Sequence, residues 1–187
     1  MSDAPAIPSA WFAADAPPLE VDFGCHRGTF LLGMAEKYPD RNFLGIEKQT
    51  ARVEKCLKKI RALGLANVHA VPGTGAEALA ALLPGESVSV FHVSFPDPWP
   101  KRRHATRRLM STRFLEEIAR VLRQGGILRV MTDDAAYFSE MKALLRPHWE
   151  ELDWQEECER PVTAFEKTFV ALGLPVHRCA MRPVSRR

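Results

Sequence analysis

The sequence lacks a long hydrophobic run, closely spaced cysteines and any basic residue near its start. None of its 187 residues falls in a stretch approaching the roughly 18 consecutive apolar residues that a bilayer-spanning helix needs. Residues 1–18 are rich in Ala and Pro and contain no Lys or Arg, whereas a secretory signal has a basic start. We therefore expect no membrane insertion and no export, and predict a cytoplasmic protein.

Cysteines are few and widely separated. Cys25, Cys56, Cys158 and Cys179 are 31, 102 and 21 residues apart, and no Cys-x-x-Cys pair occurs. A disulfide scaffold has a higher cysteine density, and a structural zinc site has paired ligands. We expect reduced, mostly buried thiols and no bound metal.

Short apolar runs alternate with helical patterns from residue 19 onward. Hydrophobic residues make up 46% of the chain and charged residues 26%, as in ordinary globular domains. The pattern predicts an α/β fold: a mostly parallel sheet with helices on both faces and an antiparallel strand at the C-terminal end. We expect a flexible segment at 1–18 and a single domain at 19–187. The predicted strands are 19–23, 42–46, 68–71, 88–93, 127–131, 149–154 and 176–181, and a helix through Phe114 to Leu122 is expected to stop at Gly125–Gly126.

Ligands of such sheets bind beyond the carboxyl ends of the strands. The first of the loops at that edge contains Gly24 and Gly28, which allow a tight turn and close approach of a ligand. Glu47 ends the second strand at the spacing of a carboxylate that binds ribose hydroxyls, and Asp22 could bind the amino end of an aminoacyl-type cofactor. An ordinary strand–helix turn is the alternative. NAD fits poorly, because His26 stands where a dinucleotide-binding loop has glycine.

Prolines enclose a carboxylate after the fourth strand, in Phe95-Pro96-Asp97-Pro98-Trp99-Pro100. Each proline fixes its own φ and restricts the preceding residue, so Asp97 is expected to be held stiffly at the cleft. The alternative is a rigid turn, with Trp99 as its hydrophobic anchor.

A cationic arm follows this segment. Residues 94–187 carry 17 Lys and Arg against 13 Asp and Glu, and no acid interrupts the chain between Asp97 and Glu116. Such a run is suited to phosphate backbones, although a solvated loop is an equal alternative. The six cations of the arm are Lys101, Arg102, Arg103, Arg107, Arg108 and Arg113.

Two further sites carry carboxylates. Asp133 follows the fifth strand, and Thr163 and Glu166 match a helix capping box. A carboxylate can also accept both N1–H and the exocyclic amine of guanine, so Asp133 or Glu166 could read a purine. The two interpretations of Glu166 are compatible if its helix borders the cleft.

These segments, in this order, resemble the bacterial tRNA (guanine-N7)-methyltransferase family of class I, S-adenosylmethionine-dependent methyltransferases. The similarity covers roughly residues 19–183. Its most specific part is Phe95–His104 continued by Arg107-Arg108-Leu109, joined by Gly45-Ile46-Glu47, Thr132-Asp133 and Thr163-Ala164-Phe165-Glu166.

The resemblance implies a Rossmann-like, seven-stranded class I fold and methyl transfer from S-adenosylmethionine, giving S-adenosylhomocysteine, to N7 of a guanosine in the tRNA variable loop. By the same resemblance Asp97 would be catalytic, and the cofactor would contact Asp22, Gly24, Gly28, Glu47, Gly75 and Asp97. The target guanosine would contact Lys101, Asp133, Thr163, Phe165 and Glu166, and tRNA would bind Arg102, Arg103, His104, Arg107 and Arg108.

The chain differs from the family pattern at His26, where a second glycine is usual, and near Gly75, where an acidic residue is usual. These departures leave a non-catalytic RNA-binding relative as one alternative. A methyltransferase acting on a small molecule, for which the basic loop would be incidental, is the other. We expect a monomer or a homodimer.

Overall fold

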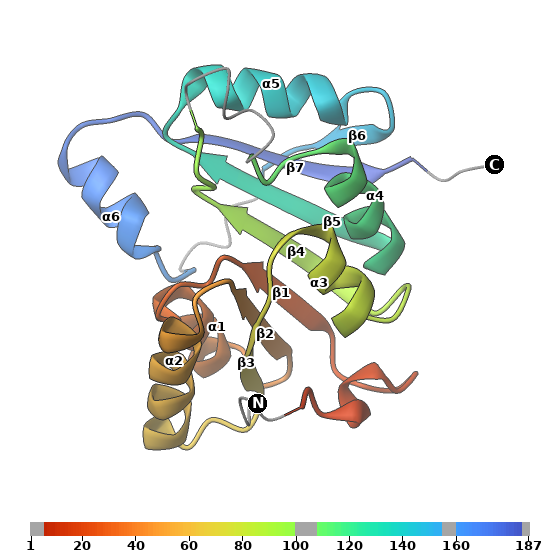
Figure 1. Ribbon diagram of the computed structural model, residues 1–187, viewed down its shortest axis with the longest axis vertical. Helices are drawn as coiled ribbons and strands as arrows, with labels where there is room; N and C mark the ends of the chain where they lie inside the picture. Colours follow the sequence, from red (N-terminus) through yellow and green to blue (C-terminus); the bar gives the residue numbers. More distant parts are fainter. Residues whose placement is uncertain (1–5, 100–107, 155–159, 185–187) are drawn as a thin grey trace.

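A computed structural model describes residues 6–99, 108–154 and 160–184. Within them one sheet runs in the order β3-β2-β1-β4-β5-β7-β6 (Figure 1). Strands β1 to β5 pair in parallel, and β7 pairs antiparallel with both β5 and β6. This order confirms the predicted mixed sheet. The strands are β1 (Leu19–Phe23), β2 (Asn42–Glu47), β3 (Val68–Pro72), β4 (Val88–Ser94), β5 (Leu122–Thr132), β6 (Trp149–Leu152) and β7 (His177–Pro183).

Helices cover both faces of the sheet. Side chains of α1 and α2 pack with Phe43 and Ala70 on one face, whereas α3, α4 and α5 join the larger core on the other face with Val21 and Phe91. Every residue of β1 and β2 is consequently buried, as expected of strands covered on both sides. The helices are α1 (Thr29–Lys37), α2 (Thr50–Leu63), α3 (Gly75–Leu82), α4 (Thr112–Val121), α5 (Ala135–Leu145) and α6 (Ala164–Ala171).

The strand order reverses between β1 and β4. From β1 the chain proceeds outward through β2 and β3, then returns to place β4 on the other side of β1. At such a switch point the connecting loops diverge and leave a crevice at the carboxyl ends of the strands. The loops that follow β1, β2, β3 and β4 therefore meet at one edge.

The largest difference from the predicted boundaries lies between α4 and β5, where the strand begins at Leu122 and not at residue 127. The glycine pair Gly125–Gly126 lies inside β5 and does not stop the preceding helix, which ends at Val121. Leu122 is already extended, with φ −67° and ψ 129°, and its N–H still bonds to Ile118 O. The register of β4 and β5 shifts between Val88 and Val90, and Gly125 at φ +77° accommodates this irregularity.

The described part of the N-terminal segment is attached to the domain. A 3-10 helix, η1 (Ser9–Phe12), precedes β1, and Ile7, Trp11 and Phe12 pack against the larger core. Whether the segment moves stays a prediction.

The cysteines agree with the expected buried thiols as far as they are described. Cys25, Cys56 and Cys179 are buried and unpaired, and Cys158 lies outside the described residues. Within the described ranges, no helix has the length and apolarity for a membrane span, and no cluster of three metal-binding side chains occurs.

Candidate functional site

A cavity of about 600 Å³ opens at the switch point. Its walls come from the loops after β1, β2, β3 and β4, the start of α4, and α6. Four of the residues predicted from the sequence to contact a cofactor line it together: Gly24, Glu47, Gly75 and Asp97. This volume lies within the roughly 300–1,000 Å³ of small-molecule sites.

Three residues of the loop after β1 have a left-handed backbone conformation. Gly24 and Gly28 have φ of +86° and +78°, and His26 adopts φ +53°. A Cβ on Gly28 would lie 2.4 Å from Cys56 Sγ, so a side chain at position 28 is excluded by packing as well. Histidine in place of the usual glycine at position 26 therefore preserves the turn, at the modest cost of placing a non-glycine residue in the left-handed region.

Glu47 is fixed by the backbone around it. Its Oε2 accepts from His26 N–H at 3.0 Å, and its Oε1 accepts from Gln49 N–H at 3.0 Å. Arg52 Nη1 lies 3.7 Å from Oε1, and the residue is only 3% exposed. Each carboxylate oxygen retains acceptor capacity after these bonds, so the group can accept from vicinal hydroxyls at the cavity.

Asp22 lies at the end of β1 directly before the cavity residues Phe23 and Gly24, and it is 6% exposed. Burial raises the pKa of Asp22 to about 6; the positive charge of His92 opposes this shift and the negative charge of Glu47 adds to it. Asp22 is not itself among the cavity-lining residues. Burial disfavours the charged form of this carboxylate, and a nearby cation would stabilise that form.

The proline-rich segment after β4 presents Asp97 to the cavity. Phe95 and Trp99 on either side have φ of +52° and +43°, an unfavourable conformation for bulky side chains. Such strain is typical of functional sites, where the surrounding structure maintains it. The Asp97 carboxylate is 65% exposed, and Lys48 Nζ lies 3.3 Å from its Oδ2.

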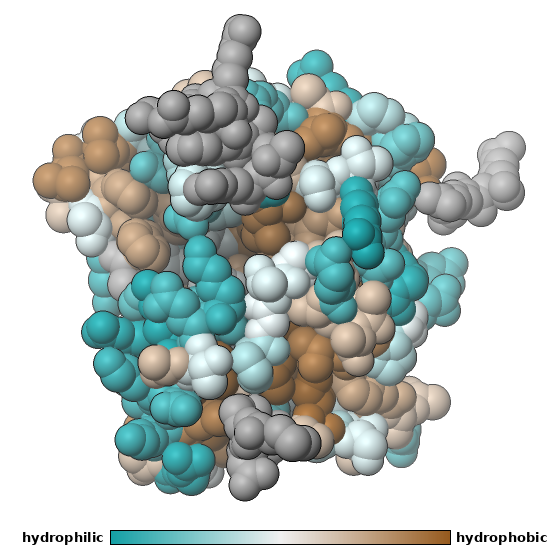
Figure 2. Space-filling view, viewed as in Figure 1, coloured by the Kyte–Doolittle hydropathy of each residue, from teal (hydrophilic) through white to brown (hydrophobic). Residues whose placement is uncertain are grey.

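An aromatic group joins this segment to α6. The ring of Phe95 lies 6.2 Å from that of Phe165 and 5.3 Å from that of Phe169, and Phe165 also meets His26 edge-on at 6.2 Å. Phe165 is half exposed and lines the cavity, and its contact with a guanosine stays a prediction. Figure 2 shows apolar side chains at the projecting end of α6, where Val170, Leu172 and Leu174 are exposed.

Arg108 is the one member of the predicted tRNA-binding set that the structure describes. Its guanidinium donates to Pro98 O at 2.8 Å and Trp99 O at 3.3 Å, pairs with Glu140 and lies over the Tyr137 ring. These contacts leave its side chain 16% exposed and fix the end of the proline-rich segment. The remaining predicted contacts lie outside the described residues: Lys101, Arg102, Arg103, His104 and Arg107.

Glu166 lies in an ion-pair cluster. Arg160 donates to both of its oxygens, at 3.0 and 2.6 Å, and Arg178 donates to Oε1 at 2.7 Å. Burial alone would raise the pKa of Glu166, but the hydrogen bond and charge of Arg160, with the charge of Arg178, outweigh it and lower the pKa. Thr163 Oγ1 caps α6 by accepting from Glu166 N–H at 3.0 Å, which confirms the N-cap half of the predicted capping box.

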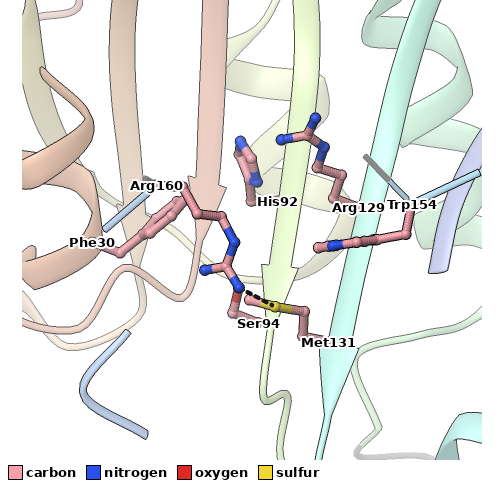
Figure 3. Close-up of a pocket in the computed structure, with 7 residues that line it drawn as sticks. All are labelled: Phe30, His92, Ser94, Arg129, Met131, Trp154 and Arg160. Atoms are coloured by element: carbon pink, nitrogen blue, oxygen red, sulfur yellow. Dashed lines mark hydrogen bonds between the residues drawn. The ribbon is translucent and has the colours of Figure 1, made fainter. Parts of the chain in front are cut away.

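A second, smaller cavity lies beside the first and shares Ser94 with it. In Figure 3 His92, Arg129, Trp154 and Arg160 point toward its centre. Its volume is about 10 Å³, enough for about one water molecule. It is therefore no site for a nucleoside.

Comparison with known proteins identifies the family. The model of a protein family described as "Putative methyltransferase" matches residues 16–179. A tRNA (guanine-N(7)-)-methyltransferase of Salmonella typhi is 35% identical over 180 residues, which is 92% of this chain and 74% of the relative. One of Limosilactobacillus reuteri is 31% identical over 95% of this chain and 88% of its own. The chain belongs to the tRNA (guanine-N7)-methyltransferase family.

Solved structures confirm the fold predicted from the sequence. An S-adenosylmethionine-dependent methyltransferase from Aquifex aeolicus superposes with a TM-score of 0.55 at 18% identity, covering 92% of this chain and 86% of its own. The seven-stranded sheet is thus the class I methyltransferase fold, and the chemistry depends on the residues of the site.

Not every site residue expected from this methyltransferase family reaches the cavity. Asp133 is half-buried after β5 and is not among the cavity-lining residues, and Gly28 lies behind the first loop against Cys56. Thr163 and Glu166 are buried at the start of α6. Their contact with a guanosine stays a prediction; for Glu166 it requires that a carboxylate held by two arginines release one of them.

Sequence analysis did not single out Lys48 and Glu77, which line the cavity of this methyltransferase, and it assigned Arg113, which also lines the cavity, to the cationic arm. Lys48 follows Glu47 directly, Glu77 lies just after the β3 loop, and Arg113 stands at the start of α4. Lys48 and Glu77 lie on or next to loops that the sequence placed at the carboxyl edge of the sheet. Their position in those loops was the signal that could have identified them. The pairing of Glu77 with Arg113, at 3.0 Å, joins segments 36 residues apart and has no sequence pattern.

Proposed function

We propose that this protein transfers a methyl group from S-adenosylmethionine to N7 of a guanosine in tRNA. One observation carries the proposal: Glu47 and Asp97 line the same cavity. Glu47 is suited to bind a ribose, and Asp97 belongs to the segment most specific to the family. The named relatives act, by their names, on guanine N7 of tRNA. The proposal implies a cytoplasmic enzyme acting as a monomer or homodimer, with no metal in the reaction.

The described residues fit an adenosyl cofactor. Glu47 offers a fixed carboxylate to the ribose hydroxyls, and Gly24 leaves the backbone open for close approach, since a Cβ there would meet no atom within 4 Å. Asp22 supplies a buried negative charge for the amino end. When bound, S-adenosylmethionine supplies an electrophilic methyl group on a positively charged sulfur.

The acceptor atom decides what the protein residues have to do. Guanine N7 carries a lone pair and no proton, so a bond from N7 to the methyl carbon forms without deprotonation, as the carbon–sulfur bond breaks. Alignment is then the main requirement, and positioned reactants gain several kcal/mol from it. Asp97 orients the guanine and offsets the positive charge that develops on the purine ring.

Phe165 lies beside the first loop, where its ring meets that of His26 edge-on at 6.2 Å. Its half-exposed ring is held by Phe95 and Phe169, which leaves an aromatic surface at the cavity for a base displaced from the RNA. Displacing a base costs a few kcal/mol, which phosphate contacts along the arm at 101–107 would offset.

The test uses the full chain, unmodified tRNA transcript and S-adenosylmethionine labelled in its methyl group, with 7-methylguanosine mapped by chemical cleavage. We expect label at one guanosine of the variable loop. Cofactor binding and RNA binding without transfer would support the non-catalytic alternative, and transfer that needs no tRNA would support the small-molecule alternative.

A further inference from the structure

His26 makes one contact through its backbone and a different one through its side chain. Its N–H donates to Glu47 Oε2 at 3.0 Å, so the main chain at position 26 fixes the carboxylate that suits a ribose. Its ring lies 6.2 Å from the ring of Phe165 on α6, with the two planes at 76°. A glycine at position 26 could make the first contact and not the second. The histidine side chain therefore joins the first loop to α6.

The charge state of His26 suits an aromatic contact. Burial lowers the pKa of His26, and the positive charges around it, led by Arg52, lower the pKa further, whereas the negative charge of Glu47 opposes them. The imidazole is consequently neutral near pH 7. A neutral ring can lie edge-to-face on another aromatic ring without the cost of desolvating a charge.

Phe165 extends this contact to the segment that contains Asp97. The ring of Phe165 lies 6.2 Å from that of Phe95, which stands two residues before Asp97, and 6.3 Å from that of Phe169. His26, Phe95 and Phe165 all line the large cavity. Ring contacts thus run from the first loop through α6 to the proline-rich segment.

Helix α6 depends on few contacts for its direction, because it projects from the sheet (Figure 1). Its first turn is fixed through Glu166, whose carboxylate accepts from Arg160 and Arg178. Just beyond its other end, Leu172 is 66% exposed. The ring contacts on the cavity side therefore determine where the Phe165 ring lies relative to the first loop.

We propose that His26 is a positioning residue that holds the Phe165 ring in line with the cofactor-binding loop during methyl transfer. This inference rests on the proposed function, because it assumes that a guanine displaced from tRNA lies on Phe165 while Glu47 holds the ribose of the cofactor. Guanine N7 has to be aligned with the methyl carbon, so a small displacement of Phe165 lowers the rate more than the affinity. His26 acts through Phe165 and not as an acid or a base.

The test compares His26→Gly, His26→Asn and His26→Phe with the wild-type chain. Single-turnover methylation of a tRNA transcript gives the rate, and calorimetry gives the affinity for S-adenosylhomocysteine. Glycine and asparagine tolerate a positive φ and keep the N–H that Glu47 accepts, so this affinity should change by less than about twofold. Both variants lack the ring, and the rate should fall about fivefold, as for the loss of one aromatic pair. His26→Phe, which restores a ring, should bring the rate to within about twofold of the wild type.

A second substitution at Phe165 shows whether the two rings act together. In a Phe165→Ala background, His26→Gly should lower the rate by less than about twofold, because the contact is already lost. A full additive loss in the double variant, or an unchanged rate in His26→Gly, would overturn the inference and leave the proposed function standing. The same holds if asparagine and not phenylalanine restores the rate, or if the affinity for S-adenosylhomocysteine falls as far as the rate does.

Glu86→Gly is the matched control for the backbone. Glu86 has φ +54°, close to the +53° of His26, and is exposed in a turn outside the cavity. Relief of backbone strain at this position should leave the rate and the affinity unchanged, and melting curves of all variants check folding. A wild-type chain that binds S-adenosylhomocysteine and methylates no tRNA would overturn the proposed function and the inference together.

Discussion

The Lys48 ammonium lies 3.3 Å from the Asp97 carboxylate and joins two loops that the sheet order keeps apart. Lys48 follows β2 and Asp97 follows β4, with β1 between these strands. The two side chains are 53% and 65% exposed, so the ion pair contributes less than about 1 kcal/mol to stability. Its consequence is geometric, since it holds the carboxylate over the cavity that both residues line.

Replacing Lys48 should therefore impair positioning without unfolding the protein. We expect Lys48→Ala to lower kcat about tenfold with little change in KM for tRNA, and Lys48→Arg to restore most of the rate. Steady-state methylation at fixed salt measures both constants. An unchanged kcat with a raised KM would instead make Lys48 a phosphate contact.

Asp97→Asn tests whether the carboxylate acts by charge and position. Because N7 has no proton to lose, we expect the variant to react about 100-fold more slowly, with a rate as independent of pH as that of the wild type between about pH 6.5 and 9. Single-turnover rates at saturating cofactor give both profiles. A wild-type acidic limb that disappears in Asp97→Asn would show instead that Asp97 is an essential base.

The buried Asp22 should make cofactor binding depend on pH. Its pKa is raised from 3.8 to about 6, so in the free protein the carboxylate is protonated below about pH 6 and charged above it. A ligand cation binds the charged form, and the affinity for S-adenosylhomocysteine should fall by up to about tenfold per pH unit below pH 6. Calorimetry between pH 5 and 8 measures this dependence.

The same shift predicts a stability effect of opposite sign. Between about pH 4 and 6 the folded state holds a proton on Asp22 that the unfolded state has lost, so the contribution of Asp22 to stability falls as pH rises through this window. Asp22→Asn should accordingly raise the free energy of unfolding at pH 7 by about 2–3 kcal/mol while weakening cofactor binding. A variant that is destabilised and binds the cofactor normally would contradict this account of Asp22.

Local patterns carried the fold prediction, because periodicity and turn residues act over a few positions. Strand β1 agrees with prediction at both ends, whereas the Gly125 irregularity in β5 depends on its pairing with β4, which local sequence does not encode. The order of the motifs predicted one cofactor site containing Gly24, Glu47 and Asp97, and these residues line one cavity. Glu166 pairs with Arg178 of β7 and Glu77 pairs with Arg113 of α4, and only tertiary packing reveals these two partners.

Within the cationic arm, Arg108 should behave differently from Arg103 and Arg107 when mutated. Arg103→Glu with Arg107→Glu should weaken tRNA binding and flatten its dependence on salt, because fewer counterions are released. Arg108→Glu should mainly disturb the proline-rich segment, since Arg108 donates to Pro98 and Trp99 carbonyls. Filter binding across salt concentrations, beside melting curves, separates the effects; an unchanged salt slope in the double variant would remove the arm from the interface.

The most direct test replaces the acceptor atom itself. Labelled methyl incorporation is compared between a tRNA transcript containing guanosine and one containing 7-deazaguanosine, in which a C–H group stands at position 7. The account predicts incorporation into the first transcript and none into the second. Equal incorporation into both would show that guanine N7 is not the acceptor.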